Sequence, residues 1–562
     1  MRIPFLLLFF IPFVLFSQNP YPQDYFNNPL DVPIVLAGTF AELRSNHFHS
    51  GMDIKTQHRE GLKVLASAEG FVSRIKISPF GYGKALYITH PNGYTTVYAH
   101  LSKLAPKIEA YLKEQQYEKE SYSIELFPPI KALLVQQGEL VAYSGNTGSS
   151  AGPHLHFEIR DKNEHPINPM LFGINTKDTT KPIISNLYAY PIGENSQVNK
   201  SDSKQKIRLI KQADGNFITE PIEAVGKIGF GIETVDRQDL ARNNNGVYNI
   251  QTKVNGQPNF EIDFSTFSFD ETNDINRLID YQIYKADKDR IQKLFIDTNN
   301  SLSLYKNTTD NGYLSVTDST SLVYKIKVSD FEANETWVTV SIDGKHSPDV
   351  LKQSPKVTPH YIYENKASTL TEGNVTVNFY KHTFYDDFFL DFQVSNDTLT
   401  LGPEGHAARK NFNIAFDISK YNEADKSKLF IAELVGYRKT PSYSKTTRHD
   451  NTLSTYTKDL GIYTLVSDTM APKITPLNFK NEQWISTLNT LKVKITDDLS
   501  GISDYRATIN GKWILMEYEY KNNTLTYDFS DNISTDTTND FKIIVTDNVG
   551  NSSTFEARFH RK

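Results

Sequence analysis

The sequence predicts a mainly β protein in which an N-terminal antiparallel β domain is followed by β-sandwich modules. Short runs of alternating apolar and polar residues recur along the chain, for example FVSRIKI at 71–77 and YTTVYAHL at 94–101, and such alternation is typical of strands with one buried face. Aromatic residues are plentiful, with 31 Tyr and 34 Phe, and Asn, Thr and Ser crowd the C-terminal two thirds, which favours β structure. At about 150 residues per domain, 562 residues predict three or four domains.

The charge and cysteine content exclude several classes of function. Lys and Arg number 60 against 66 Asp and Glu, for a net charge of -6, so no basic field favours nucleic acid or an anionic membrane as a partner. The chain has no cysteine. This excludes disulfides, thiol catalysis, cysteine-ligated zinc and a lipid-bearing cysteine.

The N-terminus has the composition of an export signal. Residues 1–17 contain one Arg, an apolar run over 3–16 and the small residue Ser17. The run is shorter than the roughly 20 apolar residues that a membrane span needs, so a cleaved signal peptide is predicted, with a short uncleaved anchor as the alternative. No later apolar run approaches spanning length. We therefore expect an exported protein without a membrane span after cleavage.

The first domain is predicted over residues 18–178. A lead-in rich in Pro, Asn and Tyr is expected to end at a first strand over 39–43. The runs KALYITH and YTTVYAHL are joined by PNG, which predicts an antiparallel hairpin. An insertion at about 106–130 begins with helical charge spacing. Two interpretations of it stay open: a lid or wall of a substrate groove, and a surface excursion.

The segment GPHLHFEI at 152–159 combines ionisable side chains with a core pattern. In a strand, His154, His156 and Glu158 lie on one face, while the apolar residues between them lie on the other. Two imidazoles at this spacing stand roughly 7 Å apart, close enough to act on one bound water. Glu158 is interpreted as a structural group or a group supporting the histidines.

Further ligand types occur upstream. In HFHSGMD at 47–53, His49 and Asp53 offer a nitrogen and an oxygen, which zinc accepts at about 2.0–2.2 Å. Three protein ligands plus a water are typical of a catalytic zinc site, not of a closed structural one. His47 would share a face with His49 in an extended segment, and the spacing to Asp53 favours His49. His100, on the strand face of Tyr98, is a second candidate for proton transfer.

Taken in order, these residues resemble the lysostaphin/LytM-type zinc metallopeptidases, which cut peptide bonds in bacterial peptidoglycan. The resemblance rests on Arg44, HxGxD, YAHL, SGNTG and GPHLHFEI and covers roughly residues 30–175. It implies one zinc ion per chain. It implies that His49, Asp53 and His156 are the zinc ligands. It also implies that His154 and His100 lie beside the bound water. Arg44 is interpreted as a substrate-binding residue or a support of the fold.

The resemblance implies a secreted zinc metalloendopeptidase that hydrolyses peptidoglycan cross-links or stem peptides during wall remodelling. One alternative is a bacteriolysin directed against competitors. Another is a non-catalytic activator or scaffold for wall amidases. The periplasm is the favoured compartment, and an extracellular location is the other possibility.

The C-terminal part contains a repeat. DTTKPII at 178–184 is echoed by DTMAPKI at 468–474, and this pair marks the start of each module. YKIKVSDFEAN at 324–334 is echoed by FKIIVTDNVGN at 541–551, and this pair marks the end of each module. These modules resemble bacterial immunoglobulin-like domains. They are predicted at 179–346, with an insert near 270–293, and at 469–562. Residues 347–468 form a further β-rich domain of no assigned family. We expect these domains to act as spacers or to bind an envelope protein partner or wall polymer.

Overall fold

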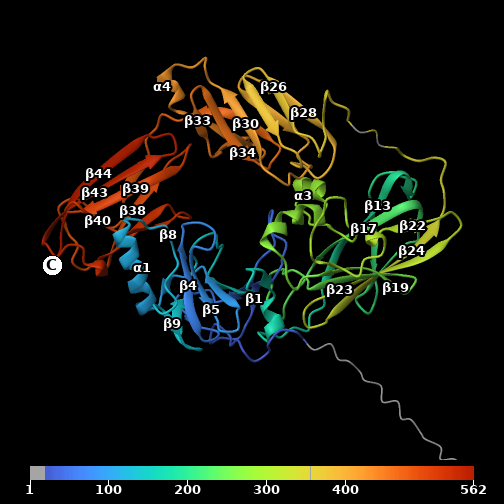
Figure 1. Ribbon diagram of the computed structural model, residues 1–562, viewed down its shortest axis with the longest axis horizontal. Helices are drawn as coiled ribbons and strands as arrows, with labels where there is room; N and C mark the ends of the chain where they lie inside the picture. The colour runs from blue at the N-terminus through green and yellow to red at the C-terminus, as the bar shows by residue number, and fades with distance from the viewer. Residues whose placement is uncertain (1–18, 353, 355) are drawn as a thin grey trace, which may run out of the picture.

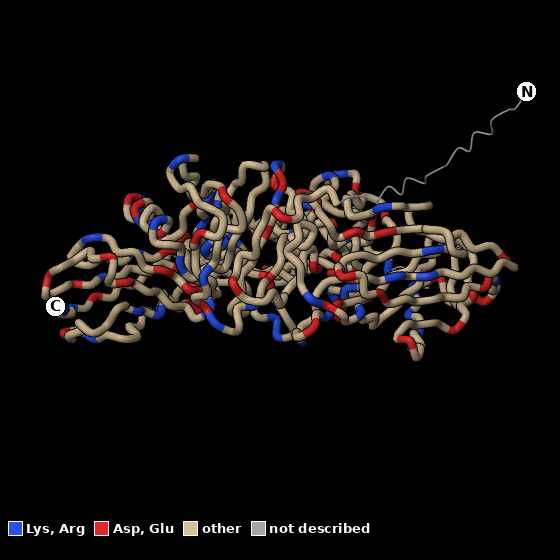
Figure 2. The backbone as a smooth tube through the Cα atoms, turned by 90° about the horizontal axis from the view of Figure 1, so that it is seen from below, with Lys and Arg blue, Asp and Glu red and all other residues tan. Residues whose placement is uncertain are grey.

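The computed structural model describes residues 19–352, 354 and 356–562, so the predicted signal peptide lies outside the described residues. The protein is mainly β, as predicted, and its four domains follow one another around a ring that brings the last beside the first (Figure 1). Among the described residues, none of the helices has the length and apolar character that crossing a membrane requires. Acidic and basic residues are interspersed along the tube of Figure 2.

The N-terminal domain is built on one antiparallel sheet. Its strands run in the order β1 (Leu36–Gly38), β2 (Met52–Lys55), β11 (His154–Arg160), β6 (Thr95–Ala99), β5 (Lys84–Thr89), β4 (Gly70–Ile77) and β8 (Ile124–Leu126), with β12 (Pro166–Ile167) beside β11 and β9 (Leu134–Val135) beside β4. A small second sheet contains β3 (Lys63–Leu65), β10 (Leu140–Tyr143) and β7 (Lys103–Leu104). The predicted hairpin is confirmed as β5 and β6.

The prediction of a first strand over 39–43 is wrong. Ala41 adopts a left-handed backbone conformation, with φ of 56°, which a strand cannot contain. The chain instead folds back, and the backbone N–H of Ala41 donates to the carbonyl of His49 at 2.8 Å. The first strand is β1, three residues upstream.

The predicted helix of the insertion is α1 (Pro106–Glu118), which starts with a proline at a position that needs no backbone N–H donor. Ile108 and Leu112, one turn apart, are buried in the core of the N-terminal domain. A short 3-10 helix, η1 (Pro169–Phe172), follows the last strand of this domain.

The second domain is a β domain with helical turns near 269–287, and hydrogen bonds link its twelve strands into one sheet. The main order is β14 (Gln205–Ile207), β13 (Ile183–Val198), β17 (Ile222–Val235), β24 (Glu335–Gly344), β23 (Ser321–Ser329), β18 (Asn249–Val254), β19 (Gln257–Asp263) and β21 (Tyr305–Lys306); the shorter strands are β15 (Leu209–Lys211), β16 (Phe217–Thr219), β20 (Gln292–Lys293) and β22 (Leu314–Val316). The sheet is continuous because one edge of the long β17 pairs with β13 and the other with β24, β22 and β20. The insert contains η2 (Phe269–Asp274), α2 (Ile275–Leu278) and α3 (Tyr281–Asp287), and another 3-10 turn is η3 (Asp310–Gly312).

The third and fourth domains are each formed by two sheets around one core. The third contains β25 (His360–Ile362), β28 (Phe388–Ser395), β29 (Thr398–Gly402), β35 (Ile462–Ser467), β31 (Leu429–Val435) and β32 (Thr440–Tyr443) in one sheet, β26 (Ser368–Glu372), β27 (Val375–Phe379), β30 (Phe412–Asp417), β34 (Thr452–Thr457) and β33 (Thr447–His449) in the other, and α4 (Glu423–Lys426). The fourth contains β36 (Lys473–Pro476), β38 (Thr490–Thr496), β42 (Thr524–Asp528) and β41 (Met516–Glu519) in one sheet. Its other sheet contains β37 (Gln483–Trp484), β44 (Ser552–His560), β43 (Thr538–Asp547), β39 (Ile502–Ile509) and β40 (Lys512–Trp513), and the domain also has the 3-10 turn η4 (Phe529–Asp531).

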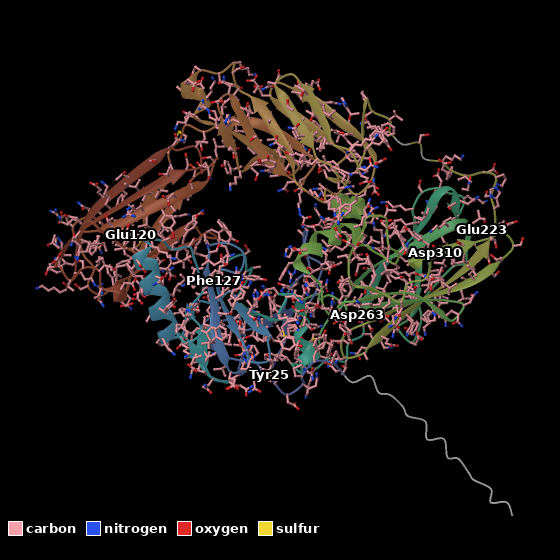
Figure 3. All side chains as sticks on the ribbon, in the orientation of Figure 1. Tyr25, Glu120, Phe127, Glu223, Asp263 and Asp310 are labelled. Carbon is pink, nitrogen blue, oxygen red and sulfur yellow. The ribbon has the colours of Figure 1, made fainter. Side chains whose placement is uncertain are left out.

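The fourth domain packs against α1 of the first. Lys113 forms an ion pair with Asp531, and the hydroxyl of Tyr117 donates to Asp531 at 2.6 Å. Glu120, labelled at this contact in Figure 3, pairs with Arg506 at 2.5 Å. The helix at the start of the predicted insertion therefore contacts the fourth domain, a role that neither sequence interpretation included.

Candidate active site

Strand register brings the predicted site residues together. β11 lies between β2 and β6, so that His156 is opposite Asp53 on one side and Ala99 on the other, directly before His100. The alternation predicted for β11 is confirmed, since its apolar side chains lie in the core. The glycine of HSGMD has a steric role, because a Cβ on Gly51 would lie 2.3 Å from the carbonyl oxygen of Phe157.

Three ligand atoms converge at this point of the sheet. His49 Nε2 lies 3.0 Å from Asp53 Oδ1 and 3.0 Å from His156 Nδ1, and His156 Nδ1 lies 2.9 Å from Asp53 Oδ1. All three side chains are buried. Their mutual positions make them one of the groups of the described chain that could hold a metal ion.

The other nitrogen of each histidine is held by an acceptor. Nδ1–H of His49 donates to the carbonyl of Thr39 at 2.7 Å, and Nε2–H of His156 donates to Glu158 Oε1 at 2.7 Å. Protons placed on these outer nitrogens leave lone pairs on the two nitrogens that face Asp53, which is the arrangement that metal-ligating histidines adopt.

Glu158 is fully buried and its oxygens are occupied. Oε1 also accepts from Ser50 at 2.7 Å and from the hydroxyl of Tyr82, and Oε2 accepts from Arg160 Nε at 2.6 Å. Burial alone would raise the pKa of Glu158, but Arg160 and His156 hold it below its usual range. Glu158 is therefore a charged acceptor that fixes the orientation of His156.

His100 and His154 lie next to the three ligand residues. Their ring centroids are 4.8 Å apart, and Nε2 of His154 lies 3.3 Å from Asp53 Oδ1. Nδ1–H of His100 donates to the carbonyl of Thr147 at 2.8 Å, and Nδ1–H of His154 to the carbonyl of Gly152 at 2.8 Å. Burial, together with the neighbouring histidines, lowers the pKa of His100 to about 3. His100 is thus neutral, and its Nε2 is the nitrogen that can accept a proton.

Comparison with known proteins assigns this part of the chain. Residues 47–117 and 131–169 match Peptidase family M23. The N-terminal domain is an M23 peptidase domain. The match is interrupted over 118–130, so the segment additional to the family pattern begins after α1 and is shorter than the predicted insertion. Residues 359–468 match the Zu5-like domain, which assigns the region that sequence reasoning left without a family.

Two curated relatives each match about a quarter of this chain. The DD-carboxypeptidase/endopeptidase Mpg of Neisseria meningitidis is 34% identical over 139 residues, which are 25% of this chain and 26% of that protein. The peptidoglycan DD-endopeptidase ShyB of Vibrio cholerae is 31% identical over 122 residues, 22% of each protein. The chain thus spans about a quarter of the length of these curated relatives. Among solved structures, the catalytic domain of lysostaphin from Staphylococcus simulans matches at 21% identity and a TM-score of 0.19, covering 25% of this chain and 93% of that one.

The M23 site opens into a pocket of about 1000 Å³ that a second domain helps to form. Phe269 and Thr272 of the helical insert line one wall, and Thr272 Oγ1 accepts from the backbone N–H of Phe48 at 2.9 Å. Sequence reasoning missed both residues, because they lie over 100 positions from the motifs and carry no local signal. The segment 106–130 contributes no residue to the pocket lining.

Arg44 also lines the pocket, beside the predicted ligands. Its Nη2 lies 3.4 Å from Asp53 Oδ2 and 3.5 Å from Glu42 Oε2. Arg44 thus contacts the oxygen of Asp53 that faces away from the two histidines. His47, the alternative to His49, lines the pocket with Nδ1 against the carbonyl of Ser45.

The residues present fit a divalent metal ion of the M23 type. Ligands of a tetrahedral zinc ion at about 2.0–2.2 Å are roughly 3.3–3.5 Å from one another. The observed separations of 2.9–3.0 Å therefore need an outward movement of only a few tenths of an ångström. Hydrogen bonds to Asp53 and Glu158 raise the pKa of His156 to about 9 against the effect of burial, and metal binding would release that proton.

Proposed function

We propose that this chain is an exported zinc metalloendopeptidase that hydrolyses peptide bonds in peptidoglycan cross-links or stem peptides. The convergence of His49, Asp53 and His156 beside two further histidines carries the proposal. The names of Mpg and ShyB, an endopeptidase and a peptidoglycan DD-endopeptidase, support the reaction and the substrate.

The proposed mechanism divides roles between ligands and proton carriers. A zinc ion bound by His49, Asp53 and His156 would polarise the scissile carbonyl and lower the pKa of the attacking water toward 7. Neutral His100 takes up a proton at Nε2 while Thr147 holds its Nδ1–H. His154, whose Nδ1–H is held by Gly152, lies beside His100, and in its imidazolium form, which also carries a proton on Nε2, it would donate to the oxyanion or to the leaving amine.

The pocket shape supports a peptide as the substrate. About 1000 Å³ of space accommodates an extended peptide segment, and Arg44 with its exposed side-chain portion offers a cation to a substrate carboxylate. Phe269, which is 38% exposed, presents an apolar surface on the opposite domain. The stem peptides of peptidoglycan carry both apolar and carboxylate groups, so this lining matches them.

The decisive experiment uses the full chain, loaded with zinc and incubated with purified sacculi, with the released muropeptides separated by mass. We expect wild type to remove cross-linked dimers. His100→Ala should keep one zinc per chain and lose about 10²–10⁴-fold in rate, the usual contribution of a general acid or base. His156→Ala should lose zinc as well as activity.

A matched control is His165→Ala, because His165 belongs to the same domain but pairs with Asp161 at the surface. It should retain both zinc and activity. Zinc bound at one per chain without any product from wild type would contradict the enzymatic proposal and favour the activator or scaffold role.

A further inference from the structure

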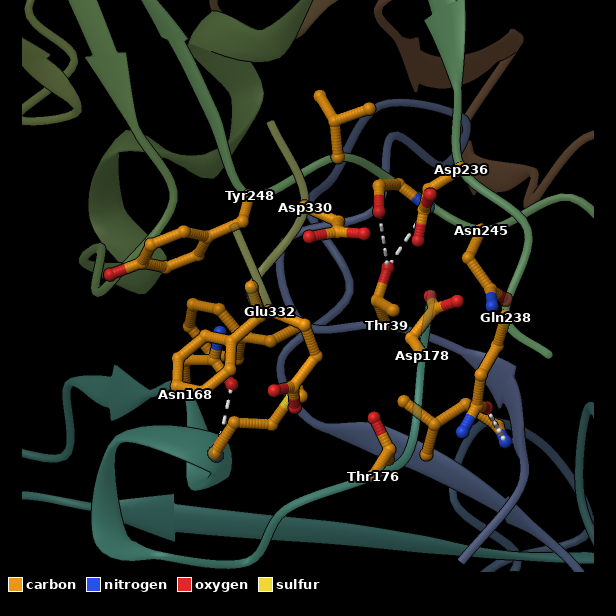
Figure 4. A pocket seen from close by; sticks show the side chains of 16 residues that line it. Thr39, Asn168, Thr176, Asp178, Asp236, Gln238, Asn245, Tyr248, Asp330 and Glu332 are labelled. Atoms are coloured by element: carbon orange, nitrogen blue, oxygen red, sulfur yellow. Dashed lines mark hydrogen bonds between the residues drawn. The ribbon is translucent and has the colours of Figure 1, made fainter. Parts of the chain in front are cut away.

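A second cluster of ligand-type residues lies outside the peptidase site, at the junction between the M23 domain and the second domain. Asp236 directly follows β17, Asp330 directly follows β23, and Asp178 lies in the segment that enters β13. One carboxylate oxygen from each lies within 4.8 Å of the others. Figure 4 shows the three side chains directed into one pocket beside Thr39.

Two of the three carboxylates in this cluster, those of Asp236 and Asp330, are buried without a compensating cation, and Asp178 is half-buried. Asp236 is 4% exposed and Asp330 5% exposed, and Asp236 Oδ1 is a buried oxygen that accepts no hydrogen bond. Within the described chain, none of the three carboxylates forms an ion pair with Lys, Arg or His. Burial, Asp330 and Asp178 raise the pKa of Asp236 to about 7. A buried carboxylate oxygen without a hydrogen-bond partner is energetically costly, and a cation bound to it would offset that cost.

The other two carboxylates are held rigidly. Asp330 accepts from the backbone N–H and the side-chain amide of Asn334, both at 2.8 Å, and Asp178 Oδ1 accepts from the backbone N–H of Thr180 at 2.9 Å. The pocket that they line encloses about 30 Å³. Such a space accommodates a single ion or water molecule. The frame is therefore preorganised around a point that a cation can occupy.

The same arrangement recurs in the fourth domain. Asp468, Asp497 and Asp547 also place ligand oxygens within 4.8 Å of one another. Asp547 accepts from the backbone and side-chain N–H groups of Asn551 at 2.8 and 2.7 Å, as Asp330 does from Asn334. In both domains the asparagine amide also donates to the backbone carbonyl of the first aspartate, at 3.1 Å to Asp178 and 3.0 Å to Asp468. The repeated motif thus preserves a three-carboxylate frame.

We propose that Asp178, Asp236 and Asp330 bind a Ca²⁺ ion at the junction between the M23 domain and the second domain. An all-oxygen set of carboxylates selects a hard cation, and Ca²⁺ accepts oxygen ligands at about 2.3–2.6 Å in flexible geometry. Water molecules would complete the coordination.

The bound ion would stabilise a segment that supports the peptidase site. Thr39 lines the same pocket, and its hydroxyl accepts from the backbone N–H of Gly246 at 2.9 Å. The carbonyl of Thr39 accepts from Nδ1–H of His49. Gln238, two residues after Asp236, accepts from the backbone N–H of Leu36 at 2.7 Å. One cation would therefore hold the second domain against both ends of the segment 36–39.

The test titrates CaCl₂ into the zinc-loaded full chain and measures the stoichiometry by calorimetry, with thermal unfolding recorded in Ca²⁺ and in chelator. Asp236→Asn should bind one Ca²⁺ fewer per chain than wild type. Ca²⁺ should raise the unfolding temperature of wild type by a few degrees, and Asp236→Asn should lose the part of that rise due to this site. In chelator, Asp236→Asn should be at least as stable as wild type, because it removes an uncompensated buried charge.

The matched control is Asp497→Asn, at the equivalent position in the fourth domain, which should keep the junction ion. The proposal is overturned if wild type and Asp236→Asn bind the same number of Ca²⁺ ions, or if wild type takes up Mg²⁺ and no Ca²⁺. It is also overturned if Asp236→Asn is destabilised equally in Ca²⁺ and in chelator. Because calcium binding is measured directly, the outcome does not depend on peptidase activity.

Discussion

At the scale of single residues, the protonation pattern of the site is set by acceptors outside the ligand triad. Thr39 and Glu158 hold the outer nitrogens of His49 and His156, and Thr147 holds that of His100. Each contact places the proton away from the reacting centre. The histidines are therefore ready to bind a cation or to accept a proton without a change of tautomer.

This arrangement predicts that Glu158→Gln weakens metal binding without removing a ligand. Loss of the buried negative charge makes His156 a poorer ligand, and such substitutions cost about 10–100-fold in metal affinity. Competition with a chromogenic chelator measures the change. Glu164→Gln is the control, because Glu164 also pairs with Arg160, at 3.0 Å, but is exposed. Equal losses in the two variants would assign the effect to Arg160 instead.

A second residue-scale prediction concerns His90, which is buried away from the catalytic centre. Its ring nitrogens contact the carbonyl of Glu69 and the hydroxyl of Thr96, both at 2.8 Å, and burial lowers the pKa of His90. The unfolded chain therefore binds more protons than the folded chain in the window below about 6.5. Stability due to neutral His90 is present above that pH and is lost as the pH falls toward the lowered folded pKa.

His90→Gln should flatten this part of the pH profile, which is at most about 1.4 kcal/mol per pH unit for one proton. Urea unfolding of the zinc-loaded chain at several pH values from about 4.5 to about 8 measures this pH dependence of the free energy of unfolding. These pH values span the range in which histidines titrate. His165→Ala, at the surface, serves as the control. An unchanged slope in His90→Gln would show that the imidazole does not carry the dependence.

At the scale of elements, the register of three strands assembles the site. β2, β11 and β6 each contribute a ligand or proton carrier at or directly beside the same level of the sheet. The close approach of β2 to β11 depends on the absence of a side chain at Gly51. The spacing between Asp53 and His156 is therefore sensitive to a single methyl group.

Gly51→Ala should push β2 away from β11 and separate Asp53 from His156. We expect a destabilisation of about 1–3 kcal/mol, the usual cost of overpacking, and a loss of zinc affinity. Thermal unfolding and zinc content measure the two effects. Gly461→Ala is the control, because a Cβ there would make an ordinary contact at 3.5 Å. Normal zinc binding by Gly51→Ala would show that the strands adjust without moving the ligands.

Local patterns predict β11, the hairpin and α1, and the resemblance to the LytM-type peptidases adds the set of residues that converge at the site. The alternation of His154 to Ile159 is a property of neighbouring residues, and it is visible without the fold. The first strand was misplaced because the left-handed turn at Ala41 has no signature in residue type. Phe269 and Thr272 could not be predicted, because their place in the pocket wall depends on how two domains pack.

At the scale of the whole molecule, the ring of domains brings the fourth domain against the loop beside the active site. Lys521 Nζ donates to the carbonyls of Gly148 and Ser150, at 3.2 and 3.3 Å, and to that of Asn146. The same loop provides Thr147, which holds His100. Nearby, buried Lys84 pairs with Glu517 at 2.8 Å. The fourth domain thus fixes the backbone that positions a proton carrier.

Lys521→Ala should reduce kcat while zinc content and unfolding temperature stay near those of wild type. Removal of the cation frees the three carbonyls, so the loop shifts and His100 loses its position; a misplacement of about 1 Å can cost up to about 100-fold in rate. KM should change less, because the pocket lining remains. Lys542→Ala, on the same domain but paired with Glu556 at the surface, is the control. Lys521→Arg should recover part of the rate, because a guanidinium can still donate to the carbonyls. If kcat is unchanged in Lys521→Ala, the contact between the first and fourth domains closes the ring without affecting the chemistry.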